Sequence, residues 1–565
     1  MKASLMLFCI AITAGIAAGQ TPQASPVSIN VNLARPVGAY KPISSWFGYD
    51  ESNYTTMKYG RQLLNELHDL SPAPVYIRTH HLLTSGNGVP ELKWSSSNVF
   101  RLDANGKPVY DFTITDQTFD EFQKAGVRPM VELGFMPRDL AAPVPGITEY
   151  QLHYPKPTMG GASNNPPKDY KMWRELVRKY TEHLVERYGR QQVSTWYFEV
   201  WNEPDIGYWH GTPEEYFKLY DYAVAGVRAA LPNAKVGGPA STGPAGAKAA
   251  AFLNRFLQHC LHDKSAADGK PIPLDFISFH PKGHNTLVDG PVGGHVRMGL
   301  SNELQAAQTG FQIVAKYPQF RRLPIILSEA DPEGCAACSM KDNPANAYRN
   351  GPLYASYTAT AMKALFELQD ESKVNLIAML SWSFEFENKN YFEGFRTLAT
   401  NGIDKPILNL FRMTGLMDGE RVLTTSTGEV PLGDLVASGV RQTPDIDALA
   451  TKADREAAVM IWNYHDDDLP APPADVQVIV AGIPTNVKRV LLEHYRIDET
   501  HSNSYAAWKN MGSPQSPTPE QYAQLKAAGQ LQLLSSPEWL DVNHGAVTIE
   551  TTLPRQAVSL LHIRW

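Results

Sequence analysis

The sequence predicts an α/β fold: a (β/α)8 TIM barrel with an all-β sandwich accessory domain. Between residues 43 and 417, short apolar runs alternate with longer amphipathic stretches, as in a parallel sheet covered by helices. Eight such units fit a closed barrel. After residue 417, apolar runs follow one another with turn residues between them. A doubly wound sheet is the alternative, but no GxGxxG phosphate loop follows the first run at 43–49.

The N-terminus has the features of a secretory signal peptide. Lys2 precedes an apolar stretch, and small residues at 17–19 offer a cleavage site. The stretch is short for a membrane span, so we expect residues 1–19 to be removed and the mature chain to be exported, periplasmic or extracellular, without a membrane anchor. Residues 20–42 are expected to join the sandwich through the strand VSINVNL at 27–33.

The barrel is predicted to occupy residues 43–417 and the sandwich residues 418–565. Helical patterns such as 172–188 and 214–231 carry apolar residues at every third or fourth position. The barrel strands are expected at 43–49, 74–79, 127–133, 196–201, 235–240, 275–280, 324–329 and 375–383. The sandwich strands are expected at 456–464, 475–481, 487–495 and 556–565.

Composition and cysteine spacing narrow the class of protein. A formal net charge of -7 lacks the basic footprint of a nucleic-acid-binding protein. Cys335 and Cys338 lie in the turn-rich run DPEGCAACS, whereas a redox CxxC normally opens a helix in a small βαβ domain. We therefore favour a structural pair over a redox site. An exported chain permits a disulfide that closes a small loop here, but the sequence leaves open whether the two cysteines are bonded.

Polar residues gather at the predicted C-terminal ends of the barrel strands, where the active site of such a barrel lies. They are Arg78, His80, Glu132, Asn202, Glu203, His280, Lys282, Glu329, Trp382, Glu385 and Glu387. Carboxylates that share one rim suit glycoside hydrolysis, in which one oxygen is protonated while a neighbouring carbon is attacked. Glu199 lies inside its strand, and we expect it to join a buried ion network with a basic side chain.

The histidines raise the question of a metal site. His80 and His81 are adjacent, and His280 and His284 lie in HPKGH. Proline and glycine disrupt a helical ligand pair, and no second CxxC is present. We expect no metal and no cofactor, and histidines that bond to sugar hydroxyls.

Four stretches resemble a known family. WNEP at 201–204 and LSE at 327–329 resemble the motifs of a large clan of retaining glycosidases built on this barrel. ELGFMP at 132–137 and IDETHSNSYAAWKNMGSPQSPTPEQ at 497–521 resemble glycoside hydrolase family 39, which includes β-xylosidases and α-L-iduronidases. The resemblance extends over nearly the whole mature chain.

The resemblance implies roles for the candidate residues. Glu203 matches the general acid/base and Glu329 the nucleophile of a double displacement. The implied substrate-binding residues are Asn202, His80, Arg78, Phe135, His280, Lys282, Trp382 and Glu387. We expect a raised pKa for Glu203, from apolar surroundings and the nearby Glu329 charge, while a cation such as Arg78 keeps Glu329 ionised. Retention rests on the resemblance, because a sequence does not measure the distance between two carboxyl groups.

Lys282 bears on the choice of sugar. The family's xylosidases commonly have a tyrosine at this position, and iduronidase-like members have a lysine that can meet a substrate carboxylate. A lone ammonium could equally pair with Glu329 or with an acid of a loop. We favour an exported β-xylosidase that releases xylose from the non-reducing ends of xylo-oligosaccharides. Exo-glycosidases for α-L-iduronide or another uronic acid, for α-L-arabinoside or for β-glucoside are alternatives. A non-catalytic carbohydrate-binding barrel is a further alternative, and a barrel phosphatase or metal hydrolase lacks its ligand cluster.

The expected partner is an oligosaccharide substrate. Neither nucleic acid nor a membrane is expected as a partner, and a homo-oligomer stays open.

Overall fold

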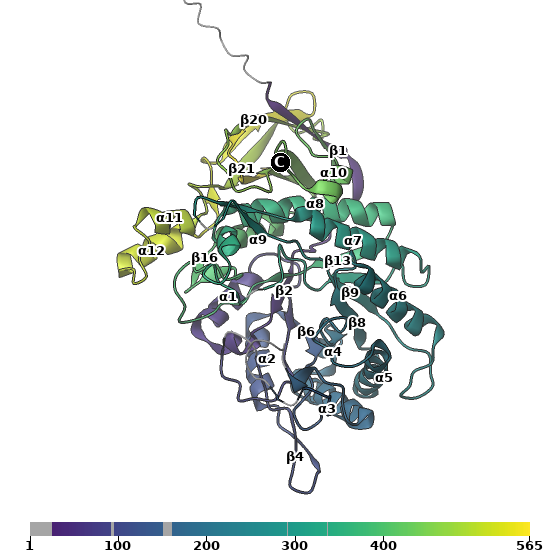
Figure 1. Ribbon diagram of the computed structural model, residues 1–565. Coiled ribbons are helices and arrows are strands. Elements are labelled where there is room, and N and C mark those ends of the chain that lie inside the picture. Colours follow the sequence, from purple (N-terminus) through teal and green to yellow (C-terminus); the bar gives the residue numbers. More distant parts are fainter. Residues whose placement is uncertain (1–24, 92–94, 148, 151–160, 291, 336) are drawn as a thin grey trace, which may run out of the picture.

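The computed structural model describes residues 25–565 except 92–94, 148, 151–160, 291 and 336 (Figure 1). The predicted signal peptide at 1–19 lies outside the described residues. In the view of Figure 1 the β-sandwich lies above the barrel, and the long helix α8 (Pro352–Ser372) lies between them. Among the described residues, no helix combines the length and the apolar character that crossing a bilayer requires.

A parallel barrel of eight strands confirms the predicted fold class. Each predicted barrel segment contains a strand, and the eighth is split at Leu380: β13 pairs with β12 and β14 pairs with β2, which completes the ring. The order around the ring is β2 (Trp46–Tyr49), β3 (Tyr76–Thr79), β6 (Arg128–Leu133), β7 (Tyr197–Val200), β8 (Lys235–Thr242), β9 (Phe276–His280), β12 (Pro324–Leu327), β13 (Asn375–Met379) and β14 (Ser381–Trp382).

One long helix follows each barrel strand. Local sequence fixes where several of them begin: Thr212 forms a capping box with Glu215 at the start of α5, and Asp169 accepts hydrogen bonds from two backbone amides of α3. The barrel helices are α1 (Lys58–His68), α2 (Thr113–Ala125), α3 (Tyr170–Tyr188), α5 (Pro213–Ala230), α6 (Ala247–His262), α7 (Leu300–Ala315), α8 and α9 (Pro406–Gly415).

Shorter elements lie in the connections between the strands and helices of the barrel. They are η1 (Ser52–Thr56), β4 (Phe100–Leu102), β5 (Pro108–Tyr110), η2 (Ala162–Asn164), α4 (Arg190–Val193), β10 (Thr286–Val288), β11 (His295–Arg297), η3 (Pro344–Asn350), β15 (Ala399–Thr400) and β16 (Ile403–Asp404).

The barrel interior is built in layers. A buried apolar cluster takes one side chain from most strands: Trp46, Tyr76, Met130, Tyr197, Phe276, Ile326, Ala378 and Leu380. β8 contributes Gly237 instead, where an added Cβ would lie 2.3 Å from the Phe276 carbonyl oxygen. Because side chains alternate along a strand, the residues two positions later form the next layer toward the C-terminal ends. Arg78, Glu132 and Glu199 occupy that layer, directly above the buried apolar cluster, which we call the apolar plug.

The sandwich is one folded ten-stranded sheet. β17 pairs with β1 along its length but with β18 only at Glu420 and Arg421, so the sheet bends there and closes over an apolar core. Its order is β22 (Gln532–Leu533), β21 (Arg489–Ile497), β25 (Val558–Arg564), β19 (Glu456–Tyr464), β18 (Asp445–Ala453), β17 (Glu420–Ser426), β1 (Val27–Ala39), β20 (Ala474–Ala481) and β24 (Ala546–Leu553), with β23 (Glu538–Asp541) beside β21. The segment 27–33, expected to join this sheet, thus lies in it.

A short helix and a helical pair complete the accessory part: α10 (Leu432–Ser438), α11 (Ser504–Asn510) and α12 (Pro519–Ala528). α11 and α12 project at the left of Figure 1. Trp508 and Leu525 pack there against Phe392 and Ile403, on the connection after the eighth barrel strand. The stretch 497–521 that carried part of the family resemblance therefore supports a loop beyond the barrel rim.

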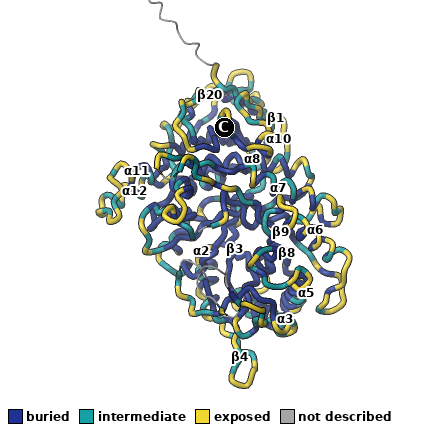
Figure 2. The backbone as a smooth tube through the Cα atoms, in the orientation of Figure 1, coloured by how far each residue is buried: buried dark blue, intermediate teal, exposed yellow. Residues whose placement is uncertain are grey.

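The barrel and the sandwich share a core, visible as continuous dark blue in Figure 2. On β25, Leu560 belongs to the same buried cluster as the barrel helices, while Leu561 belongs to the interior of the sandwich. Both side chains are fully buried. The sandwich therefore lacks an independent outer surface on this face.

This shared core predicts a single cooperative unfolding transition. Leu560→Ala and Leu561→Ala should each lower the free energy of unfolding by about 2–5 kcal/mol, and each should shift the same calorimetric transition. Separate melting of the sandwich in Leu561→Ala, with the barrel transition unmoved, would show that the two parts are independent.

Candidate active site

A buried pocket lies at the C-terminal ends of the barrel strands. Its lining is Asp50, His80, His81, Phe135, Asn202, Glu203, Tyr208, Lys282, Glu329, Gly334 and Trp382. Seven of the residues predicted from the sequence lie there. Of the other three, His280 contacts Glu203 from within the barrel, Arg78 lies beneath the pocket, and Glu387 does not line it. Asp50, Tyr208 and Gly334 were not predicted, and His81 was considered only as a metal ligand.

Two carboxyl groups, Glu203 and Glu329, face each other in this pocket. Oxygen atoms of the two side chains lie within 4.8 Å of one another, and both residues are buried. Glu203 has a φ of 44° and Trp201 a φ of 71°, a left-handed conformation that is costly for residues with side chains. Strain of this kind at the end of β7 aims the Glu203 carboxyl across the barrel mouth.

Lys282 bridges the two carboxyl groups. Its Nζ lies 3.1 Å from Glu203 Oε1 and also pairs with Glu329 Oε2. Burial acts to raise the pKa of Glu203, but the Lys282 ammonium and the hydrogen bond from His280 outweigh it and hold that pKa below its usual range. The expectation of a raised pKa is therefore wrong, because the sequence did not show that Lys282 contacts both acids.

Beneath the pocket, Arg78 holds a buried ionic layer. Its guanidinium contacts Glu199 through Nε at 2.5 Å, Glu329 through Nη1 at 3.0 Å, and both Glu132 and the Asn202 Oδ1 through Nη2 at 2.9 and 3.0 Å. The prediction of a buried ion pair for Glu199 is confirmed. Arg78 is fully buried, so it positions Glu329 and Asn202 from below instead of lining the pocket.

The same environment sets the charge of Glu329. Burial acts to raise its pKa, but His280 and Lys282, and after them His80 and Arg78, hold it well below the usual range. Glu132, in contrast, has its pKa raised to about 7, chiefly by burial. Glu329 and Glu132 both contact the Arg78 guanidinium, and Glu329, which lines the pocket, is thus the more firmly ionised of the two.

His80 lies among three carboxyl groups. Its Nδ1 is 3.0 Å from Asp50 Oδ1, and its Nε2 is 3.2 Å from Glu132 Oε2 and 3.4 Å from Glu329 Oε1. Burial acts to lower its pKa, but Glu132 and Asp50 raise it to about 9. The carboxylates thus favour the protonated ring, whereas the Arg78 guanidinium, whose Nη1 contacts Nε2, acts to lower the pKa. The Asp50 contact at Nδ1 holds the ring in its orientation.

His280 connects Glu203 to the strand that carries Glu329. Its Nδ1 lies 2.9 Å from Glu203 Oε1, and its Nε2 lies 3.1 Å from the Oγ of Ser328. The ring is completely buried. His280 thus contacts Glu203 without lining the pocket, and its Nδ1 also lies 3.7 Å from Glu329 Oε1.

Aromatic side chains form the walls. Trp382 lies 5.2 Å from the His80 ring, and Phe135 stacks on Tyr208 with centroids 5.9 Å apart. Both Trp382 and Phe135 line the pocket as the sequence predicts, and flat apolar faces of this kind suit a sugar ring.

Glu387 lies outside the pocket. Its Oε1 accepts a hydrogen bond from the backbone amide of Tyr59 at 2.6 Å, in the first turn of α1, where a carboxylate complements the helix dipole. The loop after the eighth strand directs this side chain to a helix end instead of into the pocket.

A disulfide between Cys335 and Cys338 confirms the predicted structural pair. The Arg349 guanidinium donates to the carbonyl oxygens of both cysteines, each at 2.7 Å, and to Glu333 at 2.6 Å. Gly334, next to Cys335, lines the pocket. The disulfide and Arg349 thereby fix the loop that forms one wall of the site.

Two groups of side chains have the spacing of metal ligands: Asp50 with His80 and His81, and Glu203 with His280 and Glu329. In both groups the carboxylates are already paired with cations, since Asp50 contacts the His80 ring while Lys282 contacts both Glu203 and Glu329. Protein cations occupy the places where a divalent ion would compensate these charges, so the donor set does not fit a resident metal.

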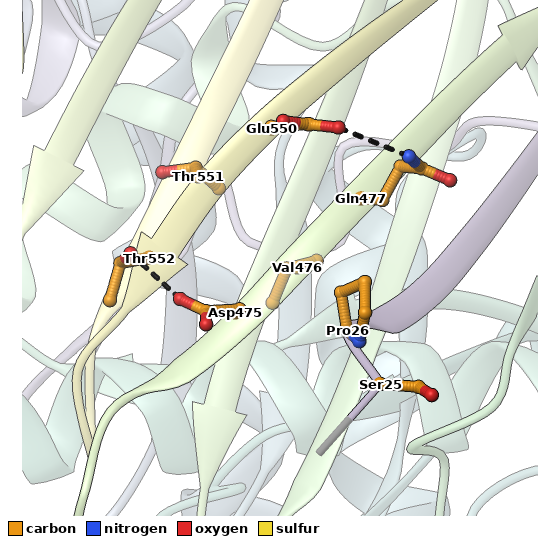
Figure 3. A pocket seen from close by; sticks show the side chains of 8 residues that line it. All are labelled: Ser25, Pro26, Asp475, Val476, Gln477, Glu550, Thr551 and Thr552. Atoms are coloured by element: carbon orange, nitrogen blue, oxygen red, sulfur yellow. Dashed lines mark hydrogen bonds between the residues drawn. The ribbon is translucent and has the colours of Figure 1, made fainter. Parts of the chain in front are cut away.

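Another hollow lies on the sandwich (Figure 3). Its polar side chains bond across β20 and β24: Gln477 Nε2 donates to Glu550 at 3.2 Å, and Thr552 Oγ1 donates to Asp475 at 3.0 Å. These pairs brace neighbouring strands, and none of the predicted site residues lies there.

Comparison with known proteins identifies the class. The family model for glycosyl hydrolases family 39 matches residues 65–535. A β-xylosidase of Caldicellulosiruptor saccharolyticus is 28% identical over 496 residues, which cover 86% of this chain and 88% of that protein. An α-L-iduronidase of Mus musculus is 25% identical over 414 residues, 69% of this chain and 61% of its own length.

Solved structures agree in fold. A monomeric β-xylosidase from Caulobacter crescentus has a TM-score of 0.72 at 22% identity, covering 95% of this chain and 99% of that chain. A bacterial orthologue of human α-L-iduronidase has a TM-score of 0.72 at 19% identity, covering 95% of this chain and 84% of that one. The protein is a glycoside hydrolase. More particularly, the chain belongs to glycosyl hydrolases family 39.

Removal of Arg78 should change both stability and pH dependence. In Arg78→Met, three buried carboxyl groups lose their shared cation, so the free energy of unfolding should fall by about 3–5 kcal/mol. The pKa of Glu329 should rise, which moves the acidic limb of the kcat/KM profile to higher pH. Denaturant titration and a pH series on an aryl glycoside measure the two effects.

Arg178→Met is the control, because Arg178 pairs with Glu175 and Glu182 on a partly exposed helix surface. It should cost less than about 1 kcal/mol and leave the pH profile unchanged. An acidic limb that stays in place in folded Arg78→Met would contradict the role of Arg78.

Proposed function

We propose that this protein is an exported retaining exo-glycosidase, with Glu203 as acid/base and Glu329 as nucleophile. The observation that carries the proposal is the spacing of the two acids, whose oxygens lie within 4.8 Å of one another. Retaining enzymes hold their carboxyl groups about 5–5.5 Å apart, and inverting enzymes about 6.5–9.5 Å to admit a water. The spacing supports double displacement.

In the first step a Glu329 oxygen attacks the anomeric carbon while Glu203 donates its proton to the glycosidic oxygen, and the aglycone leaves as an alcohol. In the second step Glu203 takes a proton from water, the resulting hydroxide oxygen attacks the same carbon, and Glu329 leaves as a carboxylate. Because the Lys282 ammonium is the strongest of the contacts that lower the pKa of Glu203, binding of the sugar must weaken the Lys282 contact before Glu203 gains its proton.

The proposed glycone is xylose, released from the non-reducing ends of xylo-oligosaccharides. The β-xylosidase of Caldicellulosiruptor saccharolyticus supports this choice, since the match covers most of both chains. The apolar stretch at 1–19 supports export, and the Cys335–Cys338 disulfide fits an oxidising compartment.

A glycosidase for a uronic acid is the second candidate, favoured by one observation. The Lys282 ammonium lies in the pocket between the two acids, where a carboxylate on the sugar could take over one of its contacts. The match to α-L-iduronidase covers a smaller share of each chain than the match to the xylosidase.

The two acids should respond differently to truncation. Glu203→Ala should lose roughly 10²–10⁴-fold in kcat/KM on substrates with poor leaving groups, turn over activated aryl glycosides, and be rescued by azide. Glu329→Ala should lose turnover at the first step on every substrate. Steady-state and burst kinetics distinguish them, and wild-type rates in either variant would refute the assignment.

The choice of sugar is tested with aryl β-xyloside, α-L-arabinoside, β-glucoside and α-L-iduronide. We expect the xyloside to have the highest kcat/KM. In Lys282→Met the pKa of Glu203 should rise, because the neighbouring cation that lowers it is gone, so the basic limb of the xyloside profile should move to higher pH.

Preference for the iduronide in the wild type, with a loss of more than about 100-fold on that substrate alone in Lys282→Met, would establish the second candidate. A loss of this size equals about 2.7 kcal/mol of binding to the substrate carboxylate. Absence of turnover on the whole panel would refute the proposed function.

A further inference from the structure

We propose that Ser328 is a positioning residue that, through His280, determines which oxygen of Glu203 carries the catalytic proton. The inference rests on the proposed function of Glu203 and extends it. Ser328 directly follows β12 and precedes Glu329, and its side chain is fully buried. Its Oγ lies 3.1 Å from His280 Nε2.

Glu203 Oε1 has two partners on the protein side. His280 Nδ1 lies 2.9 Å away and Lys282 Nζ 3.1 Å away. An ammonium only donates hydrogen bonds, so Oε1 accepts from Lys282. The hydroxyl oxygen of a protonated carboxyl is a poor acceptor for a cation, so the proton on Oε1 is disfavoured. Nδ1 of His280 therefore carries hydrogen and donates to Oε1, and the catalytic proton belongs on Oε2.

This arrangement depends on the orientation of the His280 ring. The ring is completely buried, and its Nδ1 can point at Glu203 only while Nε2 points at β12. The Ser328 hydroxyl satisfies Nε2 whichever charge the ring has, because a hydroxyl can both donate and accept. Without that hydroxyl, Nε2 is a buried polar atom without its hydrogen-bond partner. The observed orientation of the His280 ring is then no longer favoured over other orientations.

Loss of the Ser328 hydroxyl should produce a kinetic effect that general destabilisation of the fold does not produce. Once the sugar has weakened the Lys282 contact, as the proposed mechanism requires, the Nδ1 donor of His280 is what keeps the proton off Oε1. When that donor is misplaced, the proton of Glu203 can reside on either oxygen, and protonation of the leaving group becomes less effective. The defect grows with the pKa of the leaving group, because activated aryl groups depart without assistance. Loss of a hydrogen bond to the carboxylate also raises the pKa of Glu203.

The test compares Ser328→Ala, Ser328→Thr and Ser278→Ala in the full-length enzyme. Ser278 is a matched control: it is also fully buried, lies two residues before His280 on β9, and its Oγ accepts from the Ala240 amide at 3.1 Å. Each variant is assayed on aryl β-xylosides that span leaving groups from dinitrophenol to phenol and on xylobiose, and the pH dependence of kcat/KM is recorded.

Ser328→Ala should lose roughly 10–100-fold in kcat/KM on xylobiose and phenyl xyloside and less than about threefold on dinitrophenyl xyloside. Its basic limb should move to higher pH by about one unit. Ser328→Thr, which keeps a hydroxyl, should restore the wild-type dependence, and Ser278→Ala should retain it even where its melting temperature falls.

An equal loss on all leaving groups in Ser328→Ala, or the same dependence in Ser278→Ala, would overturn the role of Ser328 while leaving the roles of Glu203 and Glu329 intact. A Ser328→Thr variant that folds and still shows the defect would overturn it as well. A wild type without turnover on any glycoside of the panel in the preceding section would instead refute the proposed function, and the inference with it.

Discussion

One guanidinium organises the site. Arg78, fully buried, contacts Glu132, Glu199 and Glu329 and donates a hydrogen bond to the amide oxygen of Asn202. A buried cation with several anions is stable only when each partner is held in place, and the barrel does this, because the partners come from the ends of different strands. Glu329 therefore keeps its position through a scaffold formed by the whole ring of strands.

The alternation of side chains along each strand explains much of what the sequence predicts. The eight barrel strands were found from apolar runs, and residues at their C-terminal ends converge because parallel strands end at one rim. The same rule placed Glu199 inside the barrel, two residues above Tyr197 of the apolar plug. The fold class and the set of polar residues at the rim follow from such local patterns, whereas the choice of Glu203 and Glu329 as the pair of acids, and of Phe135 as a wall, rests on the family resemblance.

Other features depend on contacts that a single sequence does not contain. Glu387 is directed to the start of α1 by the path of its loop, which no periodicity specifies. Asp50 lines the pocket because it comes directly after Tyr49, the last residue of the first barrel strand. The sequence around it contains no motif that distinguishes it from a solvated acid. The strands β17, β18 and β24 of the sandwich were not predicted, because polar residues interrupt their apolar ones and leave no continuous apolar run. The short strands β22 and β23 were not predicted either.

Lys282 affects both the charges of the two acids and the choice of substrate. Two carboxylates within 4.8 Å repel each other, and the ammonium between them offsets that repulsion. In the proposed mechanism this suits the second step directly: once the sugar is bonded to Glu329, that charge is gone, and Lys282 keeps Glu203 ionised as a base. The first step needs the opposite state, since Glu203 must be protonated. The sugar that binds productively is then the one whose own groups draw Lys282 away from Glu203, so the lysine links recognition of the glycone to protonation of the acid.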